Sequence, residues 1–151
     1  MNYTTAMIQL PLVKGAGNVP VRTPEDVSGI CDDLRLLAQE VIQVLCLNTR
    51  NCLVNRHMVT LGLADASLVH SREMFRTAIQ DGAFALLLVH NHPSGDPTPS
   101  AEDIKITKQL IETGKIVDID VLDHIIIGRT DENGNGRSHF SMREEGICQF
   151  G

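Results

Sequence analysis

Hydrophobic residues along the chain follow strand-like or helix-like spacing. Residues 41–47 and 83–89 are almost unbroken apolar runs, which predicts two buried strands. Residues 52 to about 63 should return antiparallel to the first of these strands, after a turn at 48–51. Further strands are predicted at 117–127, with an interruption near Asp123, and at 138–142, after the turn at 131–136.

Three segments have the spacing of helices. Thr23-Pro24-Glu25-Asp26 offers an N-cap residue, a proline at the first helical position and acids in the first turn, so a helix is predicted to run to about Gln39. Residues 71–80 form a short amphipathic pattern that stops at a glycine. Ser100 is expected to open a third helix, with Gly114 at its end.

The order of these elements predicts a mixed α/β domain built on one sheet that is flanked by helices. The 151 residues have the size of one ordinary domain. Residues 1–22 are expected to form an N-terminal arm, and residues 23–151 the folded domain. The apolar patch at 7–13 in the arm is a candidate strand, for this sheet or for that of a neighbouring molecule.

Composition narrows the class of protein. The longest apolar runs are too short to span a bilayer, and the N-terminus lacks a basic segment followed by an apolar core, so a soluble, cytoplasmic protein with no membrane partner is expected. A net charge of −6 argues against a general affinity for nucleic acid, which needs clustered Lys and Arg. The four cysteines lack the paired spacing of a zinc ribbon or a disulfide framework, which favours reduced thiols.

The stretch after the second apolar run carries candidate chemistry. His90 and His92 lie two residues apart, so in an extended strand both imidazoles point to the same side. Asp103 adds a carboxylate, and two imidazoles with one carboxylate suffice to hold a catalytic Zn²⁺ whose fourth position takes water. The prolines and glycine of the loop at 93–99 should hold such ligands stiffly.

A purely structural role competes for part of this stretch. Residues 100–103 fit the pattern Ser-x-x-acid of a capping box, in which Ser100 and Asp103 satisfy the backbone at the start of a helix. This alternative leaves the two histidines unexplained.

The spacing His-x-His-x7-Ser-x2-Asp, made by His90, His92, Ser100 and Asp103, resembles the JAMM motif of JAB/MPN metallopeptidase domains. The stretches HPSGDPTPS at 92–100 and LDHIIIG at 122–128 are similar to the RadC family in particular. The resemblance covers roughly residues 24 to 146. It implies a JAB/MPN fold of the cytidine-deaminase-like type, and zinc-dependent hydrolysis of a peptide or isopeptide bond in a protein or peptide substrate.

The resemblance also implies roles for single residues: zinc ligands, a general base near the junction of the first helix and the next strand, and a group that stabilises developing negative charge. The zinc ligands would be His90, His92 and Asp103. Glu40 would be the general base, and Ser100 would stabilise the negative charge. Ser100 as the N-cap would use the same oxygen, and the sequence leaves open which role dominates.

Glu73 is the rival general base, because residues 70–73 align with a stretch of the family that usually reads His-Pro-Arg-Glu. Glu40 is favoured, since Glu73 falls on the polar face of an amphipathic helix. Asp123 and His124 are either orienters of a ligand imidazole or a buried pair that satisfy each other. The remaining histidines have no evident partner and are expected to be structural or exposed; they are His57, His70 and His139.

The chain also departs from the resemblance. RadC-like proteins carry a helical region of the helix-hairpin-helix type, associated with DNA binding, before this domain. Here about 23 residues precede the first core helix, which is too few for such a module. A DNA-repair-associated protein is therefore the second interpretation. A non-catalytic MPN interaction module ranks last, because every polar position of the motif is present.

Overall fold

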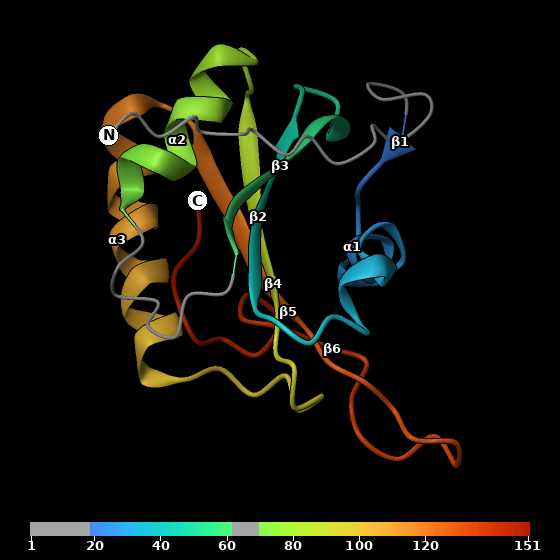
Figure 1. Cartoon of the computed structure of the whole chain (residues 1–151). Coiled ribbons are helices and arrows are strands. Elements are labelled where there is room, and N and C mark those ends of the chain that lie inside the picture. The colour runs from blue at the N-terminus through green and yellow to red at the C-terminus, as the bar shows by residue number, and fades with distance from the viewer. Residues whose placement is uncertain (1–18, 62–69) are drawn as a thin grey trace, which may run out of the picture.

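The computed structural model describes residues 19–61 and 70–151 (Figure 1). The apolar patch at 7–13 lies outside these residues. The elements in chain order are β1 (Val19–Pro20), α1 (Pro24–Ile30), the 3₁₀ turn η1 (Asp32–Leu34), β2 (Val41–Leu47), β3 (Cys52–Leu61), α2 (Ser71–Gln80), β4 (Ala85–Asn91), α3 (Ala101–Val117), β5 (Asp120–Ile127) and β6 (His139–Ser141). The predicted hairpin β2–β3 and the helix at 71–80 are confirmed.

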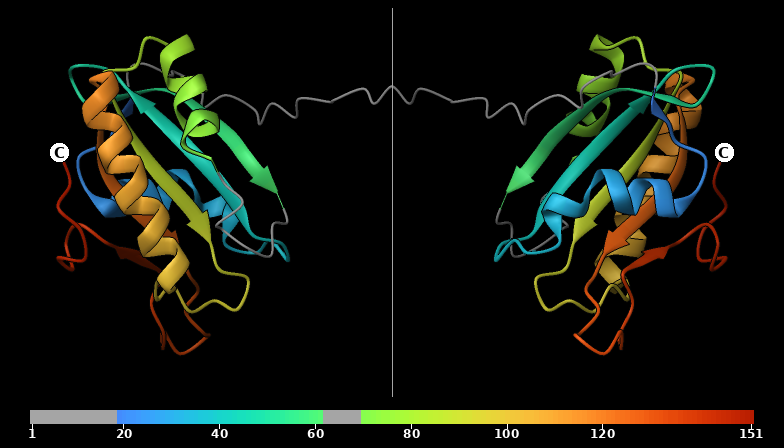
Figure 2. Two further views of the ribbon diagram at one scale, coloured as in Figure 1. Left: turned by 90° about the vertical axis from the view of Figure 1, so that its left-hand side faces the viewer. Right: turned by 90° about the vertical axis from the view of Figure 1, so that its right-hand side faces the viewer.

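The strands form one six-stranded sheet with the order β1-β3-β2-β4-β5-β6. Among the strands of the described residues, only β4 and β5 pair in parallel, and α3 is the crossover between them. Helices α2 and α3 cover one face of the sheet, and α1 lies on the other (Figures 1 and 2). The predicted mixed α/β class, with one sheet flanked by helices, is confirmed.

Both central strands are buried on both faces, which explains their unbroken apolar sequence. Even-numbered residues of β2 and β4, such as Val44 and Leu88, pack in a cluster with α2 and α3. Odd-numbered residues, such as Leu45 and Leu87, pack in a second cluster with α1. Residue parity on β4 therefore indicates which face of the sheet a side chain occupies.

The first helix is shorter than predicted. Helix α1 begins at Pro24 with the expected capping box between Thr23 and Asp26, but it ends at Ile30 rather than near Gln39. The 3₁₀ turn η1 follows, and Leu37 is exposed, so the apolar spacing beyond Leu34 does not mark a buried helical face. The chain from there to β2 is extended or turned, and it brings Glu40 to the start of that strand.

The third helix is longer than predicted, because α3 continues through Gly114 to Val117. Gly114 marks a close approach rather than a helix end: a Cβ at this position would lie 2.5 Å from the carbonyl oxygen of Ile119. The predicted interruption near Asp123 is confirmed, since the register between β4 and β5 shifts by one residue between Leu86 and Leu87. In the described part of the chain, no helix is long and apolar enough to cross a membrane.

Candidate metal centre

The end of β4 and the start of α3 meet at one point. Strand β4 continues to Asn91, two residues further than the apolar run predicts, so His90 is a strand residue. The backbone N–H of His92 donates to the carbonyl of Ile127 at 3.1 Å and so keeps the chain beside β5. The loop 93–99 then returns, and Asp103 lies in the first turn of α3.

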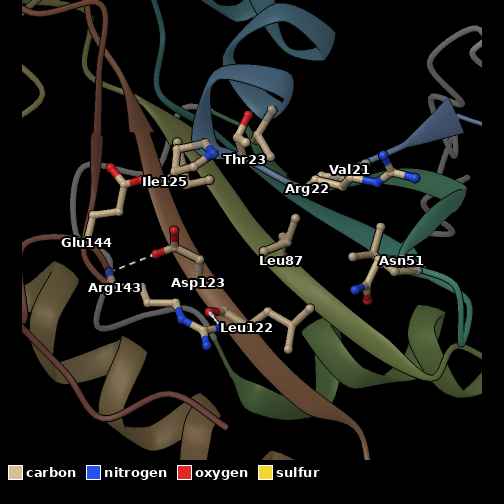
Figure 3. Close-up of a pocket in the computed structure, with 13 residues that line it drawn as sticks. Val21, Arg22, Thr23, Asn51, Leu87, Leu122, Asp123, Ile125, Arg143 and Glu144 are labelled. Atoms are coloured by element: carbon tan, nitrogen blue, oxygen red, sulfur yellow. Dashed lines mark hydrogen bonds between the residues drawn. The ribbon is translucent and has the colours of Figure 1, made fainter.

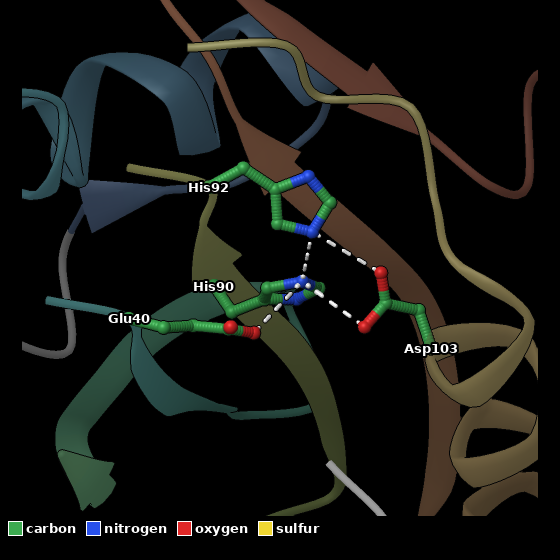
Figure 4. A group of neighbouring side chains, drawn as sticks. All are labelled: Glu40, His90, His92 and Asp103. Atoms are coloured by element: carbon green, nitrogen blue, oxygen red, sulfur yellow. Dashed lines mark hydrogen bonds and ion pairs between the residues drawn. The ribbon is translucent and has the colours of Figure 1, made fainter. Parts of the chain in front are cut away.

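The structure brings together the ligand atoms of Glu40, His90, His92 and Asp103, which all lie within 4.8 Å of one another (Figure 4). The Nε2 atoms of the two histidines are 2.9 Å apart. His92 Nε2 is 3.1 Å from Asp103 Oδ2, and His90 Nε2 is 3.3 Å from Asp103 Oδ1. Glu40 Oε1 lies 3.5 Å from His90 Nε2.

The ring orientation of His92 is fixed by the backbone. Its Nδ1 lies 2.8 Å from the carbonyl oxygen of Asp96. A carbonyl only accepts, so Nδ1 carries the proton and donates it. In the neutral ring, Nε2 of His92 therefore presents a lone pair to the group.

Asp103 caps the start of α3 together with Ser100, and its carboxylate also faces His90. Its Oδ2 accepts from the backbone N–H of Ser100 at 2.8 Å, and its own N–H donates to Ser100 Oγ at 3.1 Å. The predicted capping box is thus present, and Oδ1 still faces His90. Because Ser100 uses its oxygen as an acceptor, its hydroxyl proton stays available for donation. The two roles considered for this residue are therefore compatible.

Burial and close neighbours shift the pKa values of Asp103 and His92. Burial opposes ionisation of Asp103, but the adjacent imidazoles of His90 and His92 and the hydrogen bond from the Ser100 amide outweigh it, so the pKa of this carboxyl lies far below its usual range. For His92 burial acts in the opposite direction, yet the neighbouring Asp103 and the Asp96 carbonyl raise the pKa of the imidazole. A positive charge is thus favoured beside the carboxylate.

These donors fit a divalent metal ion. Imidazole nitrogens and a carboxylate oxygen are common zinc ligands, and His90, His92 and Asp103 point such atoms at one another. A cation placed among these atoms would satisfy lone pairs that otherwise face each other.

Glu40 is held next to this group by Asn91, a residue outside the His-x-His-x7-Ser-x2-Asp pattern. The buried Asn91 amide accepts from the Val41 N–H at 2.7 Å and donates to the Gln39 carbonyl at 3.0 Å. These bonds clamp the backbone on both sides of Glu40. The signal available in the sequence was a polar residue, between the two histidines, on a strand that is otherwise apolar.

Glu73 does not join the group. It lies on α2, where its carboxylate is 3.4 Å from Arg76 and 3.7 Å from Arg72, and its side chain is 42% exposed. This is the ordinary environment of a glutamate on a polar helix face.

Asp123 and His124 point to opposite faces of the sheet. His124 is buried, its Nε2 is 2.6 Å from His90 Nδ1, and burial holds the pKa of its imidazole well below the usual value. Asp123 instead accepts from its neighbour's backbone N–H at 2.7 Å and from Ser141 Oγ and the Arg143 N–H. Burial raises the pKa of its carboxyl, against the effect of these bonds.

Asp123 lines a pocket of about 560 Å³ on the α1 face (Figure 3). Leu87 and Ile125 form part of its apolar lining, and Arg143 lies at its side. Since Leu87 and His90 have opposite parity on β4, this pocket and the metal-ligand group lie on opposite faces of the sheet.

The other histidines differ from one another. His57 does have a partner, because its Nε2 is 2.5 Å from Asp81 Oδ2. The sequence shows no partner for it, because strand pairing and the end of α2 bring together residues that are distant in sequence. His139 lies 3.6 Å from Glu25, and His70 is an exposed N-cap residue of α2 without a side-chain cap bond.

Comparison with known proteins identifies the domain. The family model described as the RadC-like JAB domain matches residues 21–147. The chain belongs to this family. It is 55% identical over 111 residues to a UPF0758 protein of Desulforamulus reducens, which covers 73% of this chain and 49% of that protein.

Two further relatives agree. A UPF0758 protein of Halalkalibacterium halodurans is 44% identical over 86% of this chain and 53% of its own length. One of Alkaliphilus oremlandii is 42% identical over 90% of this chain and 56% of its own. This RadC-like JAB domain thus spans about half the length of the curated relatives it matches.

Proposed function

We propose that this RadC-like JAB domain is a zinc-dependent hydrolase that cleaves an amide bond, peptide or isopeptide, in a protein or peptide substrate. The observation that carries the proposal is the meeting of two imidazoles and two carboxylates from β4, α3 and the start of β2 within 4.8 Å. Such a group joins the ligands of a catalytic metal to an acid–base residue.

His90, His92 and Asp103 would hold the metal. When bound, zinc lowers the pKa of a coordinated water toward ~7 and polarises a carbonyl group. The contribution of the protein is to hold these side chains rigidly: His92 through the Asp96 carbonyl, and Asp103 through the Ser100 amide.

Glu40 would act as the general base and then as the general acid. Its side chain is 28% exposed, so the carboxylate borders both the ligand group and solvent. It takes a proton from the attacking water and delivers the proton to the leaving amine, which balances the reaction. The clamp that Asn91 makes on the neighbouring backbone holds the carboxylate in reach.

Ser100 would stabilise the oxyanion that forms at the attacked carbonyl. Its oxygen accepts from the Asp103 N–H of α3, which leaves its O–H available to donate. Its exposed position at the start of the helix leaves room for a substrate.

Metal analysis tests the ligand assignment. Purified wild-type protein should contain zinc, and His90→Ala and Asp103→Ala should each hold about one zinc per chain less. His70→Ala, which changes an exposed histidine outside the group, is the matched control and should retain the metal. Equal zinc content in all four proteins would overturn the assignment. Hydrolysis of a peptide library by the zinc-loaded wild type, absent in the two ligand variants, is the expected activity.

A further inference from the structure

A row of buried side chains continues from His90 into the protein. His90 Nδ1 is 2.6 Å from His124 Nε2, and His124 Nδ1 is 2.5 Å from Thr107 Oγ1. Thr107 Oγ1 in turn lies 2.6 Å from the carbonyl oxygen of Asp103. Residues from β4, β5 and α3 are thereby linked, and both His124 and Thr107 are fully buried.

The direction of each hydrogen bond in this row follows from the group at its inner end, the backbone carbonyl of Asp103. The carbonyl of Asp103 only accepts, so the Thr107 hydroxyl donates its single proton to that carbonyl. Thr107 Oγ1 must then accept from Nδ1–H of His124. A neutral His124 has no second proton, so its Nε2 accepts from Nδ1–H of His90, and Nε2 of His90 is left with a lone pair.

We infer that His124 is a positioning residue, which fixes the tautomer and the ring orientation of His90 so that Nε2 faces the metal. The inference rests on the proposed function for its purpose, but the tautomer itself does not depend on metal. The Asp96 carbonyl fixes the tautomer and ring orientation of His92 in the same way. His90 is fixed by a side chain of the neighbouring strand: His124 pairs with Leu88, two positions from His90, and lies on the same face of the sheet.

The tautomer is tested by ¹⁵N nuclear magnetic resonance on histidine-labelled, metal-free wild-type protein. His90 should carry its proton on Nδ1, and His124 should carry its own on Nδ1. A His90 ring protonated at Nε2 would overturn the inference, whatever the protein does with zinc. This readout needs no variant and no activity.

Zinc affinity tests the consequence. His124→Leu removes the acceptor and should weaken binding by about 10- to 100-fold, which is typical of the partners of metal ligands. His124→Gln places an amide oxygen near the former Nε2 and should recover much of the affinity. Thr107→Val should also weaken binding, because it frees His124 to change tautomer.

The outcomes separate the two proposals. If wild type binds no zinc while His90 has the predicted tautomer, the proposed function fails and the positioning row stands. If all variants fold, as judged by circular dichroism, and bind zinc equally well, His124 has no positioning role. Leucine and glutamine variants that are equally weakened would also count against it, because loss of packing alone would then explain the effect.

A different group of side chains carries a second inference. Cys46 of β2, His57 of β3 and Asp81 at the end of α2 place one ligand atom each within 4.8 Å of the others. The His57 and Asp81 side chains are 25% and 17% exposed, whereas Cys46 is buried. The group thus has a thiol on its inner side and an imidazole and a carboxylate toward solvent.

The geometry points to a second divalent-cation site here, of the kind that zinc prefers. Thiolate, imidazole and carboxylate are zinc ligands, and three protein ligands leave one coordination position for water. On binding, the Cys46 thiol releases its proton to solvent, and the cation replaces the proton shared between His57 and Asp81. Cys46 lies six positions after Glu40, or about 20 Å along the extended chain of β2, so this site is separate from the first.

Cobalt distinguishes this site from the first, which contains no sulfur. Titration with Co²⁺ should give a near-ultraviolet thiolate-to-cobalt absorption in wild type and in Asp103→Ala. Cys46→Ser should abolish the absorption without unfolding the protein, and Cys31→Ser, which alters another buried thiol, should keep it. Cobalt binding without this absorption in wild type, or its persistence in Cys46→Ser, would overturn the inference.

Discussion

Glu40 and Glu73 differ in their surroundings, and this difference predicts opposite effects of the same substitution. Glu40 borders the metal-ligand group, while Glu73 pairs with two arginines on α2. Glu40→Gln should keep the bound zinc but lower turnover by about 10²- to 10⁴-fold, because the amide cannot take a proton. Glu73→Gln is the control and should leave turnover unchanged. Full activity in Glu40→Gln, measured on a cleavable peptide, would place the base elsewhere.

At the scale of residues, the sequence predicts most where the chemistry is local. His90, His92 and Asp103 lie within fourteen positions, so strand parity and the following turn already suggest that they meet. Asn91 is missed because its partners, Val41 and Gln39, lie about fifty positions away, at and just before the start of β2. His124 appears among the candidates, but its link to Thr107 depends on how α3 packs against β5, which no spacing reveals.

At the scale of elements, the two helical glycines invite opposite predictions. Gly114→Ala should lower the free energy of unfolding by about 1–3 kcal/mol, because the new methyl group meets a backbone carbonyl at 2.5 Å. A Cβ at Gly29, in α1, would meet no atom of a neighbouring element within 4 Å. Gly29→Ala should therefore raise the free energy of unfolding by about 0.5–1 kcal/mol. Urea denaturation of both variants checks the pair; equal effects would mean that the approach of Ile119 is not rigid.

Elements are predicted well in kind and less well in extent. The capping signals fix the start of α1 and α3, because Thr23 and Ser100 act on the adjacent backbone. Helix ends are decided by tertiary contacts. The segment after α1 is held by Arg35, whose guanidinium donates to the carbonyls of Gly128 and Ser138 across the molecule. Apolar spacing contains no information about such a bond.

At the scale of the whole molecule, charge bears on the alternative of a DNA-associated function. Thirteen basic residues against nineteen acidic ones give a net charge of −6. We expect this chain to bind duplex DNA no more tightly than about 10⁻⁴ M at physiological salt, because phosphate contacts need clustered cations. Fluorescence anisotropy over a series of salt concentrations measures this. Tight binding that weakens steeply with salt would favour the nucleic-acid interpretation over a protein or peptide substrate.

Asp103 joins two parts of the molecule that are usually separate, since one carboxylate caps α3 and faces the ligand histidines. A cation that binds only the folded chain adds about 2.7 kcal/mol of stability at one hundred times its dissociation constant. Because Asp103 lies in the first turn of α3, the bound cation would stabilise this turn in particular. Chelation should therefore expose the amides of this turn to hydrogen exchange, and proteolytic sensitivity at the helix start would report how much of a preparation is loaded.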